Sequence, residues 1–341
     1  MSFLYVTEPG STVAADGNRL QIIREGETLR WVPISKLQQL ILIGPIGLTV
    51  GARNLCLKHG IDTIFLSSSG AYRGRLIGPL PAYAELRWLQ YQQLHNPDFA
   101  LAFTREIVRG KIVNLRNLLL KRTEPTPATT ELRQLATKAA AADSIDVARG
   151  YEGRAAALYY NAFGGLITNP DFSFTSRNRQ PPRDPLNILL SLGYTILAAR
   201  VESAIHQTGL DIALGALHLP QNGKPSLALD LMEEFRPSIV DTTVLRCVNL
   251  RILRPDDFHS TADSTDYLAN APAEDTDRPL RFQKEALHKY LTQLDNKFLT
   301  HVFYPPLAAK LSFRDVILHQ VRRFIRALKN EDSYVAFTPH L

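Results

Sequence analysis

Cysteine is scarce in this sequence, and its scarcity narrows the possible classes of protein. Only two cysteines occur among 341 residues, Cys56 and Cys247, and they do not form a metal-type pair. Two isolated cysteines exclude a disulfide-rich secreted scaffold and a cysteine-ligated zinc fold, and they favour a reducing compartment. We therefore expect both thiols to lie in a hydrophobic core.

Long hydrophobic runs are also absent. The most apolar stretch, residues 40–50, is interrupted by Gly44, Pro45 and Gly47, which leaves it too short and too broken to span a bilayer. The first residues have neither a basic lead nor the apolar region of a signal peptide. The sequence therefore predicts a cytoplasmic protein that does not associate with a membrane.

The charge balance shows a modest basic excess instead of an extreme of either sign. The formal net charge is +6 and the sequence pI is about 9.3. Such an excess favours binding to nucleic acid or another polyanion without requiring it. Hydrophobic residues make up 45% and charged residues 21% of the chain, which is typical of a globular protein, and the length allows two domains with separate cores.

Two kinds of hydrophobic periodicity divide the chain. The first eighty residues consist of short β-branched or aromatic runs separated by turn residues, with one helix over 49–58. From residue 82 the period is helical, with helical segments at 82–121, 130–164, 185–206, 226–236 and 306–329. We predict an α+β protein with a small β-rich domain over residues 1–80, followed by a larger, all-helical domain over residues 81–341.

Acidic residues are concentrated in the segment 218–237. A helix over 226–236 places its Leu, Met and Phe side chains on one face and Asp230, Glu233 and Glu234 on the other. Taken alone, this pattern favours an ordinary amphipathic helix with a solvated acidic face. Glu233 and Arg236, one turn apart, could then form an ion pair.

Glu152 does not fit that ordinary pattern. Its helix places it in the middle of a face otherwise formed by small and apolar residues such as Ala148, Ala155 and Tyr159. An unpaired carboxylate in such a position is costly or becomes protonated, so it needs a cation nearby. Two alternatives remain open: a structural ion pair with a basic residue from another helix, or a bound metal ion.

His218 could belong to the same site. It lies at the end of a structural element, before a loop that can return the chain so that Asp230 and Glu233 lie close to it. One imidazole with two or three carboxylates suits Mg²⁺ or Mn²⁺ completed by water and phosphate oxygens. A lone histidine is more often an ordinary hydrogen-bonded residue, so the spacing alone does not decide.

Four segments of the chain resemble the CRISPR-associated protein 1 family, the adaptation endonuclease and integrase. They occur in the family's order and include the motifs "YEG" at Glu152, "ALH" at His218 and "DLMEE" at Glu233. The full segments are residues 150–163, 177–197, 215–241 and 311–328, and residues 43–76 are similar to the family's N-terminal domain.

The resemblance implies a β-domain followed by a helical catalytic domain with a Mg²⁺ or Mn²⁺ site. The implied ligands, which are also the catalytic residues, are Glu152, His218 and Glu233. Asp230 matches a further family acid that either ligates the metal or supports a ligand. Glu234 matches no functional position, and we expect it to face solvent.

The resemblance also implies an activity and partners. The family inserts new spacer DNA into a CRISPR array, and the 3′-hydroxyl of the incoming DNA attacks a phosphodiester at the repeat boundary. The nucleophile belongs to the DNA, in agreement with the absence of a serine elbow or an activated cysteine in this sequence. The implied partners are DNA, a second copy of the chain bound through the β-domain, and CRISPR-associated protein 2.

Two other functions remain open. If water replaced the 3′-hydroxyl, the same ligands would make a stand-alone metal-dependent DNA nuclease. If the acids were purely structural, the protein would be a non-catalytic scaffold that binds branched DNA. The sequence contains no motif that reads bases, so any preference for a DNA sequence would have to come from DNA shape or from the partner protein.

Several basic residues are candidates for contact with DNA phosphates. Some lie in a proline-stiffened loop, some on one face of a long helix, and others near His218 or in the last helix. Each of them could instead pair with an acid or belong to a solvated face. They are Arg177, Arg179 and Arg183; Arg105, Arg109 and Arg116; Lys224; and Arg322 and Arg323.

Overall fold

The computed structural model describes residues 2–78, 83–178, 182, 184–260 and 280–339. It divides into two compact units, Met1–Pro81 with Arg281–His288, and Ala82–Leu280 with Lys289–Leu341. The break near residue 81 lies beside the predicted domain boundary. The segment Arg281–His288 nevertheless groups with the first unit, a long-range association that a linear division of the sequence does not contain.

The first unit contains two four-stranded sheets and one helix. One sheet has the strand order β1 (Ser2–Val6), β5 (Leu37–Ile43), β7 (Asp62–Leu66), β8 (Tyr72–Leu76), and the other has the order β4 (Glu27–Pro33), β3 (Arg19–Arg24), β2 (Thr12–Asp16), β6 (Gly47–Leu48). Both sheets and α1 (Val50–Lys58) contribute to one hydrophobic core, which includes Val13, Leu40 and Cys56. The predicted β-rich start is confirmed.

Several local features agree with the sequence analysis: a helix, a turn and the two cysteines. The predicted helix over 49–58 is α1, and the Thr49 side chain caps it by accepting a hydrogen bond from the Ala52 N–H at 3.2 Å. The turn between β2 and β3 uses Gly17 at a φ of +55°, a conformation that costs glycine little. Cys56 and Cys247 are both buried free thiols, as predicted.

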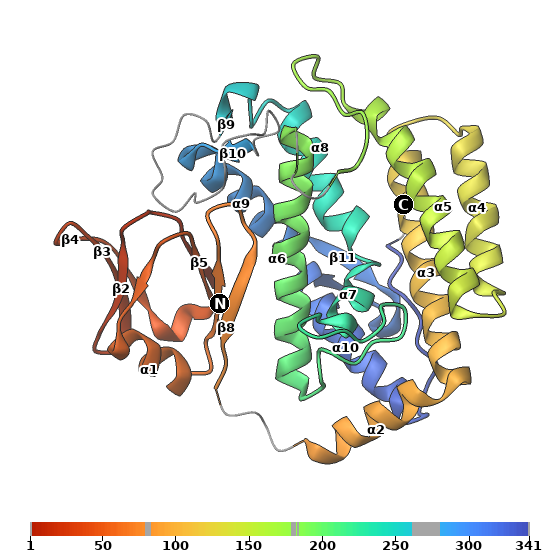
Figure 1. Ribbon diagram of the computed structural model, residues 1–341, viewed down its shortest axis with the longest axis horizontal. Coiled ribbons are helices and arrows are strands. Elements are labelled where there is room, and N and C mark those ends of the chain that lie inside the picture. The colour runs from red at the N-terminus through yellow and green to blue at the C-terminus, as the bar shows by residue number, and fades with distance from the viewer. Residues whose placement is uncertain (1, 79–82, 179–181, 183, 261–279, 340–341) are drawn as a thin grey trace. The chain divides into compact units, whose positions relative to one another are not determined.

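The second unit is mainly helical, and α3, α4 and α5 lie side by side in it (Figure 1). The α-helices after residue 83 are α2 (Ala84–His95), α3 (Pro97–Leu120), α4 (Pro127–Ala140), α5 (Ile145–Phe163), α6 (Pro185–Thr208), α7 (Ser226–Met232), α8 (Thr242–Asn249), α9 (Lys284–Leu299) and α10 (Phe313–Leu328). The predicted fold class, a β-rich domain followed by a helical one, is confirmed.

The helical half differs from the prediction in detail. The first two helical segments each divide in two, because Asn96 and Pro97 begin α3 and Ser144 caps α5. Helices α8 and α9 were not predicted, and the region is not entirely helical. Short strands β9 (Phe258–Ser260), β10 (Leu280–Phe282), β11 (His301–Tyr304) and β12 (Ala309–Ser312) occur within it, and β11 pairs antiparallel with β12 where the sequence predicted the start of a helix.

Helix α7 ends earlier than predicted, which matters for the site. It ends at Met232, and after a short turn the chain continues as the π-helical segment η3 (Pro237–Asp241) and then as α8. Pro237 has no N–H to donate to the carbonyl of Glu233, so regular α-helical bonding cannot pass this point. A wider π turn accommodates the interruption.

Helix α6 is a mostly buried helix of the second unit. It has the length and composition of a membrane span, with a mean hydropathy of 1.5, yet 78% of that stretch is buried inside the protein. Such burial is what a core helix requires, since its apolar surface is already covered by other helices. Helices α7 and α10 both pack against it.

Candidate functional site

The three acids at the end of α7 are buried. Asp230 and Glu234 are 0% exposed and Glu233 is 3% exposed, so the predicted solvated acidic face is wrong. Helix α7 carries apolar side chains on one side, but other parts of the second unit also cover the opposite side. A buried carboxylate is tolerated only with partners, and each of the three acids has a different set.

Glu234 is a structural residue instead of the solvent-facing one that was predicted. Its carboxylate accepts hydrogen bonds from Gln320 Nε2 at 3.1 Å, the Tyr334 hydroxyl at 3.0 Å and the Phe337 N–H at 2.6 Å. Burial raises the pKa of Glu234 to about 8 in spite of these donors. The residue therefore ties the end of α7 to α10 and to the segment that follows it.

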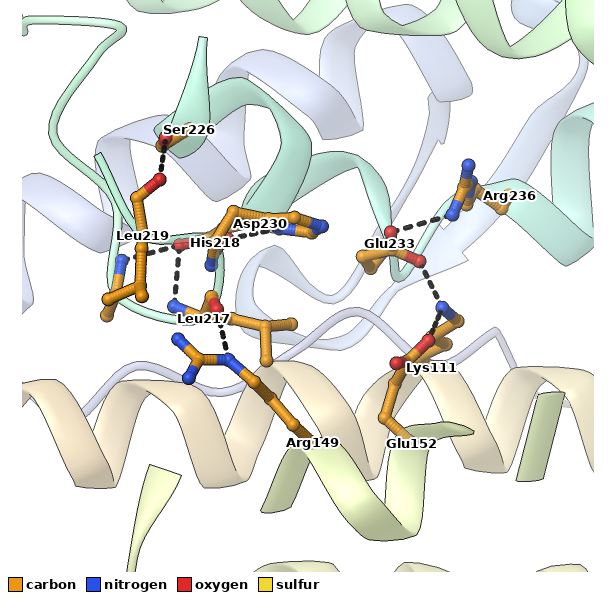
Figure 2. A network of polar contacts seen from close by, with 11 residues as sticks. Lys111, Arg149, Glu152, Leu217, His218, Leu219, Ser226, Asp230, Glu233 and Arg236 are labelled. Carbon is orange, nitrogen blue, oxygen red and sulfur yellow. Dashed lines mark hydrogen bonds and ion pairs between the residues drawn. The ribbon is translucent and has the colours of Figure 1, made fainter. Parts of the chain in front are cut away.

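Glu152 and Glu233 converge on one lysine. Lys111, a buried residue of α3, contacts Glu152 Oε1 on α5, and its Nζ lies 2.6 Å from Glu233 Oε2 (Figure 2). The predicted need of Glu152 for a cation is thus met in this structure by a lysine. Burial by itself would lower the pKa of Lys111, but the negative charges of Glu233 and Glu152 outweigh it and raise that pKa.

Glu233 is held as a carboxylate by two cations. On the side away from Lys111, Arg236 Nη1 donates a hydrogen bond to Glu233 Oε1 at 2.7 Å, so the ion pair that the spacing allowed is confirmed (Figure 2). Burial would raise the pKa of Glu233, but the charges of Arg236 and Lys111 outweigh it and lower the pKa to about 2. Glu233 is therefore ionised at any ordinary pH.

A buried network of tyrosines supports Arg236. The Arg236 guanidinium lies 4.2 Å from the centre of the Tyr194 ring, close enough for a cation–π interaction. The hydroxyls of Tyr194 and Tyr159 donate to Asp241 at 2.5 and 2.7 Å, and burial raises the pKa of Asp241 to about 6. Tyr194 thus helps to place Arg236 beside Glu233.

Asp230 organises the loop that carries His218. Its Oδ2 accepts hydrogen bonds from the Ala216 N–H at 2.7 Å and the Leu217 N–H at 3.1 Å. Its Oδ1 lies 2.8 Å from the His218 N–H and 2.7 Å from His218 Nδ1. Because a carboxylate only accepts, we assign the proton to Nδ1, which leaves Nε2 with a free lone pair. Of the two roles considered for Asp230, this geometry favours support of His218.

Arg149 joins the His218 loop to the helix that carries Glu152. It lies on α5 one turn before Glu152, and its Nε donates to the Leu217 carbonyl at 2.8 Å. The sequence analysis missed this residue, as it missed the role of Lys111 at the site. The available signal was the spacing of three residues between Arg149 and Glu152, which places both on one helix face.

The side chains at this site can be compared with the ligands that Mg²⁺ or Mn²⁺ prefers. Within the described part of the chain, no three His, Cys, Asp or Glu side chains are grouped as a ready metal site. Two carboxylates nevertheless converge on one cationic atom, and Arg149 joins the loop that carries His218 to the helix that carries Glu152. Two carboxylates and an imidazole suit Mg²⁺ or Mn²⁺, so these residues fit such an ion if the Lys111 ammonium gives way.

This fit can be tested through stability. We expect Lys111→Met to destabilise the metal-free protein by roughly 2–3 kcal/mol, because Glu152 and Glu233 lose their shared cation while Glu152 remains partly solvated. Adding Mn²⁺ should then raise the free energy of unfolding more in the variant than in the parent. Urea unfolding with and without Mn²⁺ measures both effects. Lys138→Met, at an exposed position on α4, is the control, and equal Mn²⁺ shifts in all three proteins would contradict a shared cation position.

The predicted DNA-binding arginines of α3 have partners inside the protein. Arg105 Nε donates to the Ala142 carbonyl at 2.5 Å, and Arg116 Nε donates to the Thr129 carbonyl at 3.0 Å. Arg109 forms an ion pair with Glu106, one turn earlier on the same helix, at 2.5 Å. These contacts join α3 to its neighbours, so α3 does not present a free basic stripe formed by these residues, and contact with DNA stays a prediction.

The remaining basic candidates are more varied. Arg177 donates to Asn187 Oδ1 at 2.7 Å and to Ser191 Oγ at 3.0 Å. Arg322 and Arg323 line a cavity of about 560 Å³ beside α10, and Lys224 is half-buried in the loop after His218. Their contact with DNA also stays a prediction, and Arg179 and Arg183 lie outside the described residues.

Comparisons with known proteins indicate the same family that the sequence motifs resemble. The family model described as CRISPR associated protein Cas1 matches residues 4–274. A relative from Thermus thermophilus, named CRISPR-associated endonuclease Cas1 3, is 33% identical over 330 residues, which cover 96% of this chain and 94% of that protein. A chain of a Cas6-RT-Cas1–Cas2 complex superposes with a TM-score of 0.83 at 25% identity over 98% of this chain, which corresponds to only 36% of that longer chain. A casposase bound to its integration product has the same fold, with a TM-score of 0.84 at 24% identity over 99% of this chain and 93% of that one.

Proposed function

Because the chain belongs to the CRISPR-associated Cas1 family of endonucleases, we propose that it is a metal-dependent DNA endonuclease and integrase that inserts new spacer DNA into a CRISPR array. The observation that carries the proposal is the convergence of Glu152 and Glu233 on one cation position, with His218 held by Asp230 in the loop that Arg149 joins to the Glu152 helix. These carboxylates come from α5 and from the end of α7. A structural ion pair alone would not require a histidine held by Nδ1 next to it.

The chemistry follows from the atoms around that position. The 3′-hydroxyl of the incoming DNA attacks a phosphodiester of the repeat, a new P–O bond forms, and the existing strand leaves with its own 3′-hydroxyl. A Mg²⁺ or Mn²⁺ ion held by Glu152, Glu233 and His218 would supply a Lewis acid for the scissile phosphate. Glu233 offers a permanent carboxylate because its pKa is about 2. If the metal takes the position of the Lys111 ammonium, the lysine side chain is still next to the site and can neutralise charge on a phosphate oxygen.

Partners enter the proposal through the relatives. One similar solved chain belongs to a complex that contains Cas1 and Cas2, and another was solved with an integration product. We infer that this chain acts in the cytoplasm with CRISPR-associated protein 2, as a dimer formed through its β-rich unit, on spacer DNA and the CRISPR repeat. The basic excess of the chain, +6 at pH 7, favours such a polyanionic substrate.

One assay separates the proposed activity from its alternatives. Purified protein with its Cas2 partner is mixed with a duplex that ends in a 3′-hydroxyl and with a supercoiled plasmid that carries the repeat, in the presence of Mn²⁺. We expect a covalently joined product that disappears when EDTA removes the metal. Nicking without joining would favour the stand-alone nuclease, and tight binding of branched DNA with neither reaction would favour the scaffold.

A further inference from the structure

A second polar groove lies in the helical unit, apart from the carboxylates of the candidate site. It consists of two lobes of about 490 and 450 Å³. Both lobes include Arg122, Thr242 and Lys297, so they adjoin each other at these residues. The lining residues of the groove come mainly from the end of α3, helix α8, the last turns of α9 and strand β11. None of Lys111, Glu152, His218 or Glu233 lines it.

The groove gathers positive charge without a compensating acid. Four cationic side chains line it, Lys121, Arg122, Arg246 and Lys297, and no aspartate or glutamate is among the described residues of its lining. The other polar groups there are neutral amides and hydroxyls, such as those of Asn117, Gln293 and Thr242. Lys121, Arg122 and Arg246 are exposed and Lys297 is half-buried, so an anion can reach these charges from solvent.

The pKa of Lys297 reflects both its burial and the repulsion between it and the other cations of the groove. Burial and, to a smaller extent, the positive charges of Lys121, Arg122 and Arg246 together lower the pKa of its amine to about 8. The ammonium lies 4.9 Å from the centre of the Phe313 ring, which holds it at the groove but supplies no negative charge. An anion placed between these cations would remove the repulsion.

The shape and lining indicate the kind of anion. Two lobes joined at Lys297 allow at least two linked anionic groups, and amide and hydroxyl donors can satisfy several oxygens around each. Phe303 lines the first lobe and is 45% exposed, so an aromatic face lies beside the cations, an arrangement that suits a nucleobase next to its phosphate. We propose that this groove binds a phosphate ester with two or more linked phosphates, supplied either by a free nucleotide or by a DNA backbone.

Direct binding measurements test the groove. The probes are inorganic pyrophosphate and a short single-stranded oligodeoxynucleotide, both titrated into the full chain in the presence of EDTA so that a bound metal cannot contribute. We expect Lys297→Met and Arg122→Gln each to weaken binding by about tenfold, because each removes one charge-assisted contact. For the oligonucleotide, the slope of log affinity against log salt should also become shallower by about 0.7 for each cation removed.

The two probes distinguish the sources of the phosphate. Tight pyrophosphate binding that is lost in the groove variants supports a free nucleotide. Weak pyrophosphate binding, with oligonucleotide binding that falls in the groove variants and in Phe303→Ala, supports a DNA backbone, and this source alone rests on the proposed function. If both probes bind the double variant Lys297→Met/Arg122→Gln as tightly as they bind the control Lys138→Met, the proposal is overturned. Because no cleavage or joining is measured, that result would leave the integrase proposal standing.

The same repulsion predicts how stability changes with pH. The folded pKa of Lys297 is lowered, so the cost of its charge is fully present below about pH 8 and fades as pH rises from there towards the usual lysine value. We therefore expect Lys297→Met to unfold at a higher temperature than the parent at pH 7, with a difference that narrows at higher pH. Pyrophosphate should stabilise the parent more than this variant. A thermal unfolding series over pH, with Lys138→Met as control, measures both, and an unchanged difference across the pH range would contradict the prediction.

Discussion

Replacement of Glu152 by glutamine is expected to reduce DNA joining and cleavage by about 100-fold to 1,000-fold. The amide keeps the size of the side chain but removes the negative charge that faces Lys111 and the proposed metal position. Stability should change by only about 1 kcal/mol, since the Glu152 side chain is partly solvated at 26% exposed and Lys111 keeps Glu233 as a partner. Rates with the repeat plasmid, measured over a range of Mn²⁺ concentrations, report the effect on activity.

A control substitution tests whether the loss of activity is specific to Glu152. Glu131 on α4 forms an ion pair with Arg154 at 2.8 Å, and its side chain is 37% exposed. Glu131→Gln therefore makes the same chemical change in a more exposed ion pair, one that does not include Lys111. We expect it to retain full activity and to unfold like Glu152→Gln. Full Mn²⁺-dependent activity in Glu152→Gln would rule out this glutamate as a metal ligand.

Replacement of Asp230 by alanine is expected to have the largest effect on stability, about 3–5 kcal/mol. The substitution leaves the N–H groups of Ala216, Leu217 and His218 without their buried acceptor. It also releases His218 Nδ1, so the imidazole loses its orientation, and activity should fall by about 10–100-fold even at temperatures where the protein is folded. Urea unfolding gives the first quantity, and the joining rate at low temperature gives the second.

The control for Asp230 is Asp211, an aspartate that accepts fewer backbone hydrogen bonds. Asp211 accepts a hydrogen bond from one nearby backbone group, the Ala213 N–H at 2.8 Å, and it is only half-buried. Asp211→Ala should cost about 1 kcal/mol and should leave activity intact. Asp230→Asn keeps the volume and one acceptor oxygen, so we expect it to fall between the two. A loss of stability in Asp230→Ala no greater than in Asp211→Ala would show that the loop does not depend on this carboxylate.

The burial of the acids shows where sequence reasoning failed. The helical pattern of α7 correctly places Leu227, Leu231 and Phe235 in the core, but it treats the opposite face as solvent. That face is covered in part by Gln320, which is 86 positions from Glu234 in the sequence. A hydrophobic pattern reports which residues of a helix share a face. It does not report what covers the other face, so a carboxylate with distant partners is read as exposed.

The cation beside Glu152 is a second feature that the sequence pattern could not identify. The sequence indicated that Glu152 needs a positive charge, because small apolar neighbours surround it on its helix. It could not indicate Lys111, since that lysine lies on α3 and reaches Glu152 only because α3 and α5 pack together. The basic residues were treated as a stripe for DNA, whereas Arg105 and Arg116 donate to backbone carbonyls of neighbouring segments.

The sequence by itself determined the β-rich start, the mainly helical remainder and the motifs around Glu152, His218 and Glu233, because short-range periodicity and local sequence pattern decide these features. Only the tertiary structure decided that Glu152 and Glu233 share one cation position, that Asp230 holds the His218 loop, and that Lys121, Arg122, Arg246 and Lys297 line one groove. Each of these arrangements depends on side chains from separate helices. Their distances are set by packing between elements, which the spacing of residues along one chain does not contain.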